Sequence, residues 1–583
     1  MLKNISQQAK SQAAEFLALG DQFRLGDLPT EQQAPETINL AENSKENLPK
    51  AVEQVKQLDI ITLNTLTSKV IELEAMYKAV SDTFESGNKV YLCGCGATGR
   101  LSLALEQIFR QEVAHLKRDA LKESVVSLMA GGDLALIKSV EDFEDHPEYA
   151  VQHMKDLQFG PNDLLIASTE GGETPWVIGA TNYASEYSSR QPYFLYCNPD
   201  DKLKVQRSKE VIANPKIHKI NLTVGPMAIT GSTRMQSTTI LMYAIGLAMF
   251  HCHQLTGVTK QEAESTFVQQ ATNKLNVFTE HFKNTNTGSL LSPLTEFESS
   301  IYKENNFIFY ETTSYFGLSV LTDTTERSPT FSLFPFENQQ DIHQKDFQPS
   351  LCHLLMVEDP RQPYTLKEGE TMVQRAWFDM LGGRQIRGLD SAYFQKYEQK
   401  VATKRALGYN FSPEIVELRR SYCPQNSKHY LFAVQRIVSN EGKVTLRFSI
   451  KEDKTNKEVV SSEFDLSPFQ NRRLDESIFL KILLNTHSTL VMCRLDKVKS
   501  NIMIWVRPSN LKLIDRSIRY IQYFINDRAE ELKKINPEAF NSINYDLICE
   551  ALFSESETLE YGQAIVLKTT ARILRDLFNI NDS

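Results

Sequence analysis

The spacing of apolar and polar positions changes repeatedly along the chain, and the changes predict alternating helices and strands. Residues 46–85 carry apolar side chains at the three- and four-residue spacing of a helix. Short apolar runs of strand length then follow, with helical stretches between them, at 89–93, 125–130, 164–168, 193–197 and 219–224. This alternation predicts an α/β fold with a parallel, doubly wound sheet flanked by helices.

The pattern begins again near residue 300. Asn306–Tyr310 predicts a strand, and Phe316–Glu326 predicts the helix after it. The apolar helix pattern of Ile240–Met249 also recurs in Ile482–Met492, with a slip of one residue. A period of roughly 220–240 residues is far too long for a solenoid. We therefore predict an internal repeat of two tandem α/β domains.

The chain has 583 residues, which is long enough for several domains. The second repeat contains a β-rich segment, 429–465, in which Asn440–Gly442 predicts a hairpin turn. An N-terminal helix near residues 5–20 and an irregular arm precede the first repeat, and the end of the chain is helical throughout. The predicted parts are the N-terminal helix and arm (1–45), domain 1 (46–285), domain 2 (286–505) and a helical C-terminal region (506–583).

The composition limits the class of protein. Hydrophobic residues make up 41% of the chain and charged residues 23%, as in ordinary soluble proteins. A net charge of −9 argues against nucleic-acid binding, although it leaves room for an anionic ligand in a locally positive pocket. There is no apolar run long enough to span a membrane and no signal-peptide pattern, so we expect a cytoplasmic protein.

Cysteines and histidines point to no metal site. The eight cysteines lack a disulfide framework or zinc-ligand spacing, and Cys93 and Cys95 are expected to be small buried residues beside a turn. His146 and His153 are isolated, and we expect both at the surface. The sequence therefore implies neither a metal nor another cofactor.

A glycine-rich turn follows the first predicted strand. Gly94–Arg100 places three glycines in six positions, directly before a helix whose free N–H groups point into the turn. Thr98 adds a hydroxyl donor. A dinucleotide site would need an acidic residue at the tip of the second strand, and Val125–Gly132 ends without one. We therefore favour a phosphate cradle over a nucleotide site.

Two further polar loops follow strand ends, Ser168–Pro175 and Gly231–Met235. Each alone is also a common way to begin a helix. Ligands of open α/β sheets bind beyond the carboxyl ends of the strands, where all three loops meet. Together, the loops predict a phosphate site.

These motifs resemble one branch of the SIS (sugar isomerase) domain family, that of the N-acetylmuramic acid 6-phosphate etherases and the glucokinase regulatory protein. The resemblance also covers the arm Leu28–Thr37 and the late segment Ser500–Leu513, which contains N-x-K-L. The motifs that carry it in domain 1 are Gly94–Arg100, Ala130–Gly132, Glu141–Asp145, Thr174–Pro175 and Gly225–Met235.

The resemblance implies an architecture. Etherases have one SIS domain and pair as homodimers, whereas the glucokinase regulatory protein joins two SIS domains in one chain and adds a helical C-terminal part. This chain resembles the second arrangement. We expect two tandem SIS domains with doubly wound parallel sheets, together forming a monomeric pseudo-dimer.

The resemblance also implies residue roles. Lys512 matches a lysine that reaches the sugar phosphate from the far end of the chain, and an ammonium suits phosphate as a point charge. Glu173 departs from the family, which often has serine or arginine there, so it either points away or binds a sugar hydroxyl. The expected phosphate contacts are Gly96, Thr98, Gly99, Thr169, Gly171, Thr174, Ser232, Thr233, Arg234 and Lys512.

The catalytic carboxylates of the etherases are divided between the two halves of this chain. Glu144 matches one of them in domain 1, but Ile108 stands at the place of the other. In domain 2, Asp323 and Glu326 fit the lost motif, while the turn 311–316 lacks the cradle glycines. Two carboxylates in different environments can divide acid and base work. We therefore expect one asymmetric site with Glu144 and Glu326.

Two functions remain open on the sequence. One is a sensor of a sugar phosphate resembling fructose 6-phosphate that regulates a hexokinase or glucokinase. The other is an etherase-like lyase in which Glu144 and Glu326 are catalytic. The glucokinase regulatory protein presents an apolar patch where this chain has the polar segment Ser462–Arg473, which weakens the case for docking to glucokinase. Sugar-phosphate isomerisation has only the generic fold in its favour.

Overall fold

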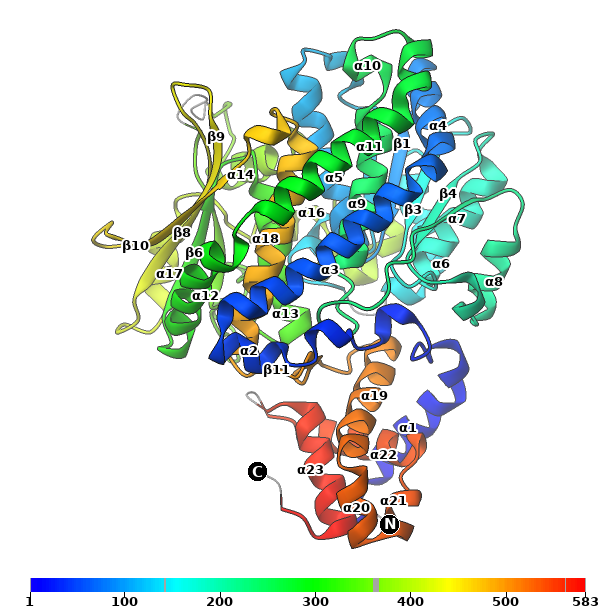
Figure 1. Ribbon diagram of the computed structural model, residues 1–583, viewed down its shortest axis with the longest axis vertical. Coiled ribbons are helices and arrows are strands. Elements are labelled where there is room, and N and C mark those ends of the chain that lie inside the picture. The colour runs from blue at the N-terminus through cyan, green and yellow to red at the C-terminus, as the bar shows by residue number, and fades with distance from the viewer. Residues whose placement is uncertain (1, 141–142, 360–365, 561–562, 582–583) are drawn as a thin grey trace.

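The computed structural model describes residues 2–140, 143–359, 366–560 and 563–581 (Figure 1). An α/β body carries both sheets, and a smaller helical lobe hangs below it. Both termini lie in the lobe, so the chain leaves the lobe, builds the body and returns.

The first sheet contains the five predicted strands in the order β2-β1-β3-β4-β5, with every pair parallel. Helices cover both faces. Along β1, Val90 and Leu92 pack into the cluster that contains α5 and α9, while Tyr91 and Cys93 pack against α6 and α7. The strands are β1 Val90–Gly94, β2 Val125–Met129, β3 Leu164–Ser168, β4 Tyr193–Tyr196 and β5 His218–Asn221.

The helices of the first half follow the predicted alternation. The stretch predicted as one helical region at 46–85 contains α3 and α4, joined by a short 3₁₀ turn. The helices are α2 Leu40–Glu46, α3 Leu48–Lys69, α4 Glu74–Glu85, α5 Ala97–His115, α6 Pro147–Asp156, α7 Pro175–Tyr187, α8 Gln206–Ala213, α9 Gln236–Phe250, α10 His253–Thr256 and α11 Lys260–Asn284.

The second sheet differs from the wholly parallel sheet that was predicted. Its order is β10-β9-β8-β6-β7, and only β6, β7 and β8 are parallel. The β-rich segment supplies β8, β9 and β10, which pair antiparallel. Only residues 439–443 and 453–457 separate these strands, too few for the crossover that parallel strands need. The strands are β6 Phe307–Thr312, β7 Cys352–Met356, β8 His429–Val438, β9 Val444–Glu452 and β10 Glu458–Asp465.

The predicted hairpin turn at Asn440–Gly442 is confirmed between β8 and β9, and Gly442 has a φ of +83°. Helices cover this half as well, and a two-stranded ribbon follows them. These elements are α12 Thr287–Lys303, α13 Gly317–Phe331, α14 Met372–Met380, α15 Glu398–Val401, α16 Thr403–Ala406, α17 Ile415–Tyr422, α18 Arg473–Arg494, β11 Val498–Lys499 and β12 Ile502–Met503.

The helical lobe joins both ends of the chain. The N-terminal helix α1, Gln7–Leu19, packs on α22, with the rings of Phe16 and Phe553 6.4 Å apart. The predicted helical C-terminal region is confirmed by α19 Leu511–Asp527, α20 Ala529–Ile535, α21 Pro537–Asn541, α22 Tyr545–Ser556 and α23 Ile565–Phe578.

The two halves meet along α9 and α18, the helices whose apolar patterns predicted the repeat. Every residue of α9 except Phe250 is buried, and α18 packs directly against it. Gly246 lies at this contact, where an added Cβ would be 2.5 Å from Cδ1 of Leu474. The seam between the halves is therefore a close-packed helix pair.

His153 corrects a prediction. It was expected at the surface, but it lies on the inner face of α6 with 4% of its area exposed and its ring beside Trp176. Burial lowers the pKa of His153 to about 4, although the nearby Asp133 opposes this effect. His146 remains partly exposed.

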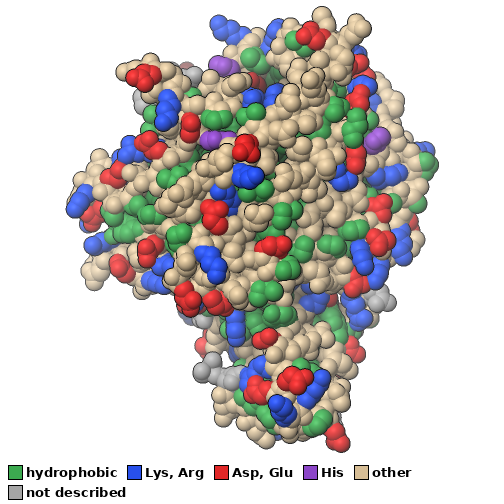
Figure 2. All heavy atoms as spheres, in the orientation of Figure 1, with side chains coloured by type: hydrophobic (Ala, Val, Ile, Leu, Met, Phe, Trp, Pro, Cys, Tyr) green, Lys and Arg blue, Asp and Glu red, His purple; other side chains and the backbone are tan. Residues whose placement is uncertain are grey.

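Three features of the described residues concern the partners that the sequence analysis considered: the surface charge, the apolar character of the helices and the placement of metal-binding side chains. On the face shown in Figure 2, acidic and basic side chains are interspersed. Within the described ranges, we find no helix with the length and apolar character needed to cross a membrane. The same ranges contain no group of three or more His, Cys, Asp or Glu side chains placed to hold a metal ion.

Gly246→Ala should destabilise the protein by about 1–3 kcal/mol, because the added methyl group cannot fit beside Leu474 without moving α9 and α18 apart. Gly20→Ala is the matched control: its nearest neighbour is the flexible side chain of Arg24 at 3.3 Å, so we expect a change within about 0.5 kcal/mol. Thermal unfolding of both variants measures the difference. Equal unfolding temperatures would contradict close packing at the seam.

Candidate functional site

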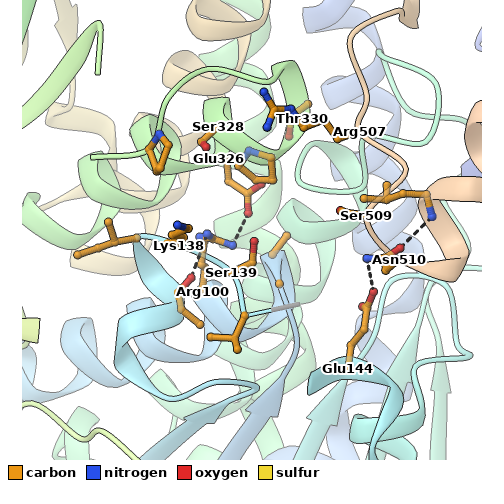
Figure 3. Close-up of a pocket in the computed structure, with 18 of the residues that line it drawn as sticks. Arg100, Lys138, Ser139, Glu144, Glu326, Ser328, Thr330, Arg507, Ser509 and Asn510 are labelled. Atoms are coloured by element: carbon orange, nitrogen blue, oxygen red, sulfur yellow. Dashed lines mark hydrogen bonds and ion pairs between the residues drawn. The ribbon is translucent and has the colours of Figure 1, made fainter. Parts of the chain in front are cut away.

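A cavity of about 750 Å³ opens beyond the carboxyl ends of the first sheet (Figure 3). Its walls come from distant parts of the chain. They include Gly96 of the glycine-rich turn, the loop Gly231–Arg234, the end of α13 from Glu326 to Thr330, and Arg507–Lys512 before and at the start of α19. Both halves and the C-terminal region therefore build one pocket.

The sequence predicted three phosphate contacts in the glycine-rich turn, and only one of them lines the cavity. Gly96, with a φ of +55°, lines it at the N-terminus of α5. The Thr98 hydroxyl donates to the carbonyl of Cys95 and accepts from its N–H, both at 2.9 Å. An added Cβ on Gly99 would be 2.4 Å from Met129. Thr98 and Gly99 thus shape the turn and lie behind Gly96.

The loop after β3 lies outside the cavity lining. The hydroxyls of Thr169 and Thr174 bond to each other at 3.1 Å, and Asn198 donates to the carbonyl of Gly171 at 3.1 Å. Glu173 folds back over this loop, so that an added Cβ on Gly171 would be 1.9 Å from its Oε2. The structure does not place Thr169, Gly171 or Thr174 on the cavity wall.

The same loop carries two buried carboxyl groups: Glu170, which the sequence analysis did not assign to the site, and Glu173, for which it left open whether the side chain points away or binds a sugar hydroxyl. Glu170 is 8% exposed and Glu173 6%. Burial raises the pKa of Glu170 to about 7, although Lys512 opposes the rise. Burial also raises the pKa of Glu173, again against Lys512. A buried carboxyl without a salt bridge is costly, and neither group forms one with the described residues.

Glu326 reaches the cavity from α13 and is held by a residue of the other half. Its Oε1 forms an ion pair of 2.7 Å with Nη1 of Arg100 on α5. Arg100 also donates to the carbonyls of Ala135 and Leu136 at 3.1 and 3.3 Å. Oε2 of Glu326 has no hydrogen-bond partner among the described residues, so this oxygen is available to a ligand.

Glu144 lies apart from Glu326 across the cavity (Figure 3). It sits in the short turn Phe143–Asp145; Glu141 and Asp142 of the same acidic motif lie outside the described residues. Asn510 donates to its Oε1 at 2.8 Å, and Nζ of Lys512 lies 3.3 Å from its Oε2. Burial lowers the pKa of Lys512, but Glu144 and Glu173 outweigh burial and raise it.

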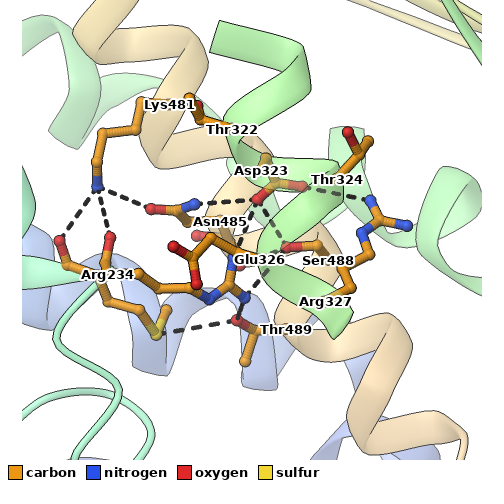
Figure 4. A network of polar contacts seen from close by, with 12 residues as sticks. Arg234, Thr322, Asp323, Thr324, Glu326, Arg327, Lys481, Asn485, Ser488 and Thr489 are labelled. Carbon is orange, nitrogen blue, oxygen red and sulfur yellow. Dashed lines mark hydrogen bonds and ion pairs between the residues drawn. The ribbon is translucent and has the colours of Figure 1, made fainter. Parts of the chain in front are cut away.

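Arg234 lines the cavity and directs its guanidinium toward α13 and α18 in the seam between the halves (Figure 4). It pairs with Asp323 of α13 at 3.2 Å and donates to Ser488 and Thr489 of α18 at 3.3 and 3.0 Å. Lys481 of α18 donates to the carbonyls of Arg234 and Met235. Arg234 therefore positions the loop that carries Ser232 and Thr233.

Ser232 and Thr233 line the cavity beside Gly231, whose φ is +68°. The arm predicted from the sequence closes on this loop from behind. Glu31 pairs with Arg516 at 2.6 Å and with Arg519 at 2.7 Å. Burial alone would raise the pKa of Glu31, but the two guanidinium groups lower it to about 2.

The charge of the cavity wall is positive; the sequence analysis allowed for a locally positive pocket but did not identify all the residues that form it. The wall contains eight Lys and Arg side chains and three Asp and Glu side chains. Lys138, Lys400 and Arg507 were not among the predicted phosphate contacts, although Arg507 lies in the resemblance segment Ser500–Leu513, and only folding brings them to the same wall. Arg100 closes the recognised glycine-rich motif, yet its pairing with Glu326 depends on the contact between the halves.

Comparisons with known proteins agree with the sequence motifs. A family model described as the glucokinase regulatory protein N-terminal SIS domain matches residues 72–185. The N-acetylmuramic acid 6-phosphate etherase of Salmonella typhi is 30% identical over 219 residues, which cover 37% of this chain and 67% of that protein. The same enzyme of Vibrio atlanticus (strain LGP32) is 28% identical over 216 residues, and the chain spans 64% of its length.

A solved structure, the C-terminal domain of glucosamine-fructose-6-phosphate aminotransferase from Francisella tularensis, is 9% identical with a TM-score of 0.34. The superposition covers 74% of this chain and 96% of that chain.

Glu31→Gln should destabilise the protein at pH 7 by about 3–5 kcal/mol, because it leaves Arg516 buried without its carboxylate partner and Arg519 with Asp515 alone. A carboxyl whose pKa falls from 4.5 to about 2 on folding stabilises the protein above pH 4.5, and this stabilisation is lost as the pH falls toward 2. The deficit of the variant should therefore shrink over that range.

Urea unfolding at pH 7 and at pH 3 checks this expectation, with Glu441→Gln on the exposed hairpin turn as the control. A deficit that is the same at both values would show that the Glu31 charge does not hold the arm.

Proposed function

The chain belongs to the branch of the SIS domain family that includes the N-acetylmuramic acid 6-phosphate etherases and the glucokinase regulatory protein, and on this premise we propose that its cavity binds a phosphorylated sugar. The observation that carries the proposal is the excess of basic side chains on the cavity wall of a protein whose net charge is −9. Such a local excess attracts a phosphate dianion.

We assign the sugar phosphate to the part of the cavity lined by Gly96, Ser232, Thr233 and Lys512, as the resemblance implies. Gly96 at the N-terminus of α5 offers backbone N–H groups, and Ser232 and Thr233 offer hydroxyls. Lys512 adds a positive charge, although its ammonium group also pairs with Glu144 at 3.3 Å. Thr98, Gly99, Thr169, Gly171, Thr174 and Arg234 would act indirectly, by fixing the backbone of these loops.

We further propose that the chain acts on its ligand as an etherase-like carbon–oxygen lyase. In this reaction a base removes the proton beside a carbonyl, the ether bond breaks, and an acid protonates the leaving oxygen of lactate; water then adds to the double bond. Glu326 keeps one oxygen open toward the cavity, and Glu144 lies across from it beside Lys512. Two carboxyl groups on two sides of a ligand can divide these proton transfers.

A second candidate is a sensor without catalysis. The match to the N-terminal SIS domain of the glucokinase regulatory protein and the fusion of two halves in one chain favour it. In this case Glu144 and Glu326 would bind sugar hydroxyls, and the protein would regulate a hexokinase or glucokinase as a monomeric pseudo-dimer.

Fructose 6-phosphate or N-acetylmuramic acid 6-phosphate should raise the unfolding temperature, because a ligand stabilises the state it binds. Thr233→Val should weaken this binding by roughly 5–10-fold, since one hydrogen bond contributes about 1 kcal/mol. The hydroxyl of Thr233 has no partner among the described side chains, so the variant should keep its own stability. Thr65→Val on α3 is the control. The absence of a shift with any sugar phosphate would refute the binding proposal.

The wild type should release lactate from N-acetylmuramic acid 6-phosphate, and Glu326→Gln and Glu144→Gln should each slow release by roughly 10²–10⁴-fold. Glu441→Gln should leave the rate unchanged, because its side chain lies on the exposed hairpin turn. Coupled detection of lactate measures the reaction.

An unimpaired Glu326→Gln would rule out the lyase mechanism. A wild type that binds the sugar phosphate and releases no lactate would favour the sensor, and inhibition of a host hexokinase or glucokinase would then be the test.

A further inference from the structure

A segment of the second half, residues 384–405, lies against the first half beside the cavity, and we call it the strap. It contains the 3₁₀ helix Ala392–Tyr397 and α15, and its Gln399 and Lys400 line the cavity. Three of its side chains belong to the apolar cluster of the first half that includes α6 and α7, namely Leu389, Phe394 and Val401. The strap is therefore built into the core of the half to which it does not belong in sequence.

A buried ion pair and polar bonds to the first half fix the strap. Arg384 is 6% exposed and pairs with Asp133 at 2.6 Å. The carbonyl of Arg387 accepts from the N–H of Asp133 at 3.0 Å, and the N–H of Arg387 donates to the Asp133 carboxylate at 2.8 Å. Ser391 donates to Asp156, the last residue of α6, at 2.7 Å. These contacts give the strap a defined position relative to α6.

Aromatic rings of the strap enclose the residue that precedes Glu144. This residue, Phe143, is 1% exposed. Its ring centroid lies 4.8 Å from that of Tyr397, in an edge-on arrangement, and 5.9 Å from that of Phe394, in a stacked one. Both are favourable geometries for aromatic pairs. The turn that carries Glu144 is thus packed against the second half.

Tyr149 of α6 completes the enclosure from the first half. Its ring centroid lies 5.1 Å from that of Phe143 and 4.4 Å from that of His146, on which it stacks. Its hydroxyl is 3.0 Å from the hydroxyl of Tyr397, within hydrogen-bond distance. Residues on both sides of Glu144 therefore pack on one ring, and that ring is bonded to the strap.

The backbone bonds of the turn are weak, so its position depends on this packing. The N–H of Phe143 donates to the carbonyl of Val140, and the N–H of His146 donates to that of Phe143, both at 3.4 Å. These distances lie beyond the usual range of about 2.7–3.2 Å. The enclosed ring of Phe143 is the stronger constraint on where the turn lies.

Glu144 lines the cavity, and its carboxylate has three partners. Besides Asn510 and Lys512, the thiol of Cys95 donates to its Oε2 at 3.7 Å. Asn510 is itself fixed, because its Oδ1 accepts from the N–H of Leu513 at 2.9 Å and so caps α19. The carboxylate keeps these contacts only while the turn holds Glu144 within reach of them.

We propose that Tyr397 and Phe394 of the strap are positioning residues for Glu144: their packing on Phe143 holds the turn where the carboxylate meets Asn510 and Lys512. The consequence for catalysis or sugar binding rests on the proposed function, since Glu144 is the group through which the strap acts. The second half then controls an acid of the first half in addition to supplying Glu326.

Cys95 reports the position of Glu144 in the absence of a ligand. It lines the cavity, whereas the other cysteines of the chain are buried. Burial raises the pKa of the Cys95 thiol, and Glu144 raises it further, although Lys512 opposes this effect. The thiolate is the form that reacts with iodoacetamide. Moving or neutralising Glu144 should therefore speed the labelling of Cys95 by roughly 3–10-fold, because a nearby like charge is removed.

A double-mutant cycle on the full chain tests the proposal. Tyr397→Leu should speed the labelling of Cys95 by roughly 3–10-fold, because the turn loses a ring contact. In a Glu144→Gln background, which already labels faster, the same substitution should change the rate by less than about 2-fold. General loosening of the packing would instead speed labelling equally in both backgrounds. Mass spectrometry of the Cys95 peptide measures the rates.

Two further variants of the strap are matched controls. Tyr397→Phe keeps the ring against Phe143, and Tyr393→Leu changes an exposed neighbour whose ring pairs with those of Tyr149 and Phe394, but not with Phe143 among the described residues. Both should label at the wild-type rate within about 2-fold. Circular dichroism checks that each variant folds, and Phe394→Leu repeats the cycle if Tyr397→Leu does not fold.

The same variants test the consequence for function. Tyr397→Leu should slow lactate release by roughly 10–100-fold and change KM by less than about 2-fold, because a displaced catalytic group affects the chemical step. It should slow Glu144→Gln no further. If the wild type binds a sugar phosphate without releasing lactate, the affinity measured by isothermal titration takes the place of the rate in this cycle.

The outcomes separate the inference from the proposed function. A wild type that neither binds a sugar phosphate nor releases lactate would overturn the proposed function, and the labelling cycle would still decide whether the strap positions Glu144. Labelling of Tyr397→Leu at the wild-type rate, or an equal acceleration in both backgrounds, would overturn the inference even in a protein that releases lactate.

Discussion

The ion pair between Arg234 and Asp323 is the contact on which the arrangement of the candidate site depends. Both side chains are almost completely buried, so the Arg234 guanidinium would have a large desolvation cost without Asp323. Hydrogen bonds complete the pair: Asn485 and Ser488 donate to the same oxygen of Asp323, and Ser488 and Thr489 accept from Arg234. Loss of Asp323 would leave the buried Arg234 without its ion-pair partner, whereas Asp323 also pairs with Arg327 at 3.3 Å, so the network holds the two halves in one arrangement.

That arrangement places the candidate functional groups. Glu326 lies one helical turn after Asp323, so the same face of α13 that binds Arg234 brings Glu326 to Arg100. On the other side of the seam, Arg234 fixes its own loop, in which Ser232 and Thr233 directly precede it and line the cavity. The helix that supplies a carboxylate and the loop that supplies hydroxyls are thus positioned by one buried interaction.

The sequence predicted the first sheet well because each strand is a short apolar run between turn residues, a local signal. It also predicted which helices repeat, since Ile240–Met249 and Ile482–Met492 are buried on all sides. For the second sheet it predicted the strand at 306–310 and the hairpin turn at Asn440–Gly442, but not that the antiparallel strands join the parallel ones in one sheet, because this pairing depends on the chain length between strands. Residue types likewise suggested that Thr98 and Arg234 contact phosphate, but the same donors can bond to the protein. Whether Thr98 faces a ligand or Cys95 is a question of side-chain direction.

The turn of the second half that corresponds to the glycine-rich turn lacks its glycines, and the structure shows which residues occupy that place. In the second half, the turn at 313–316 is occupied from both sides. Gln107 and Gln111 of α5 donate to the carbonyl of Ser314 at 3.0 and 2.7 Å, and Tyr315 donates to Glu476 at 2.8 Å while Arg473 stacks on its ring. A turn whose carbonyl and side chain are bound in this way offers no open concavity to a phosphate. The helix α5 that begins at the glycine-rich turn of the first half therefore also occupies the corresponding turn of the second half, so among the described residues this second turn cannot offer the cradle proposed for the first.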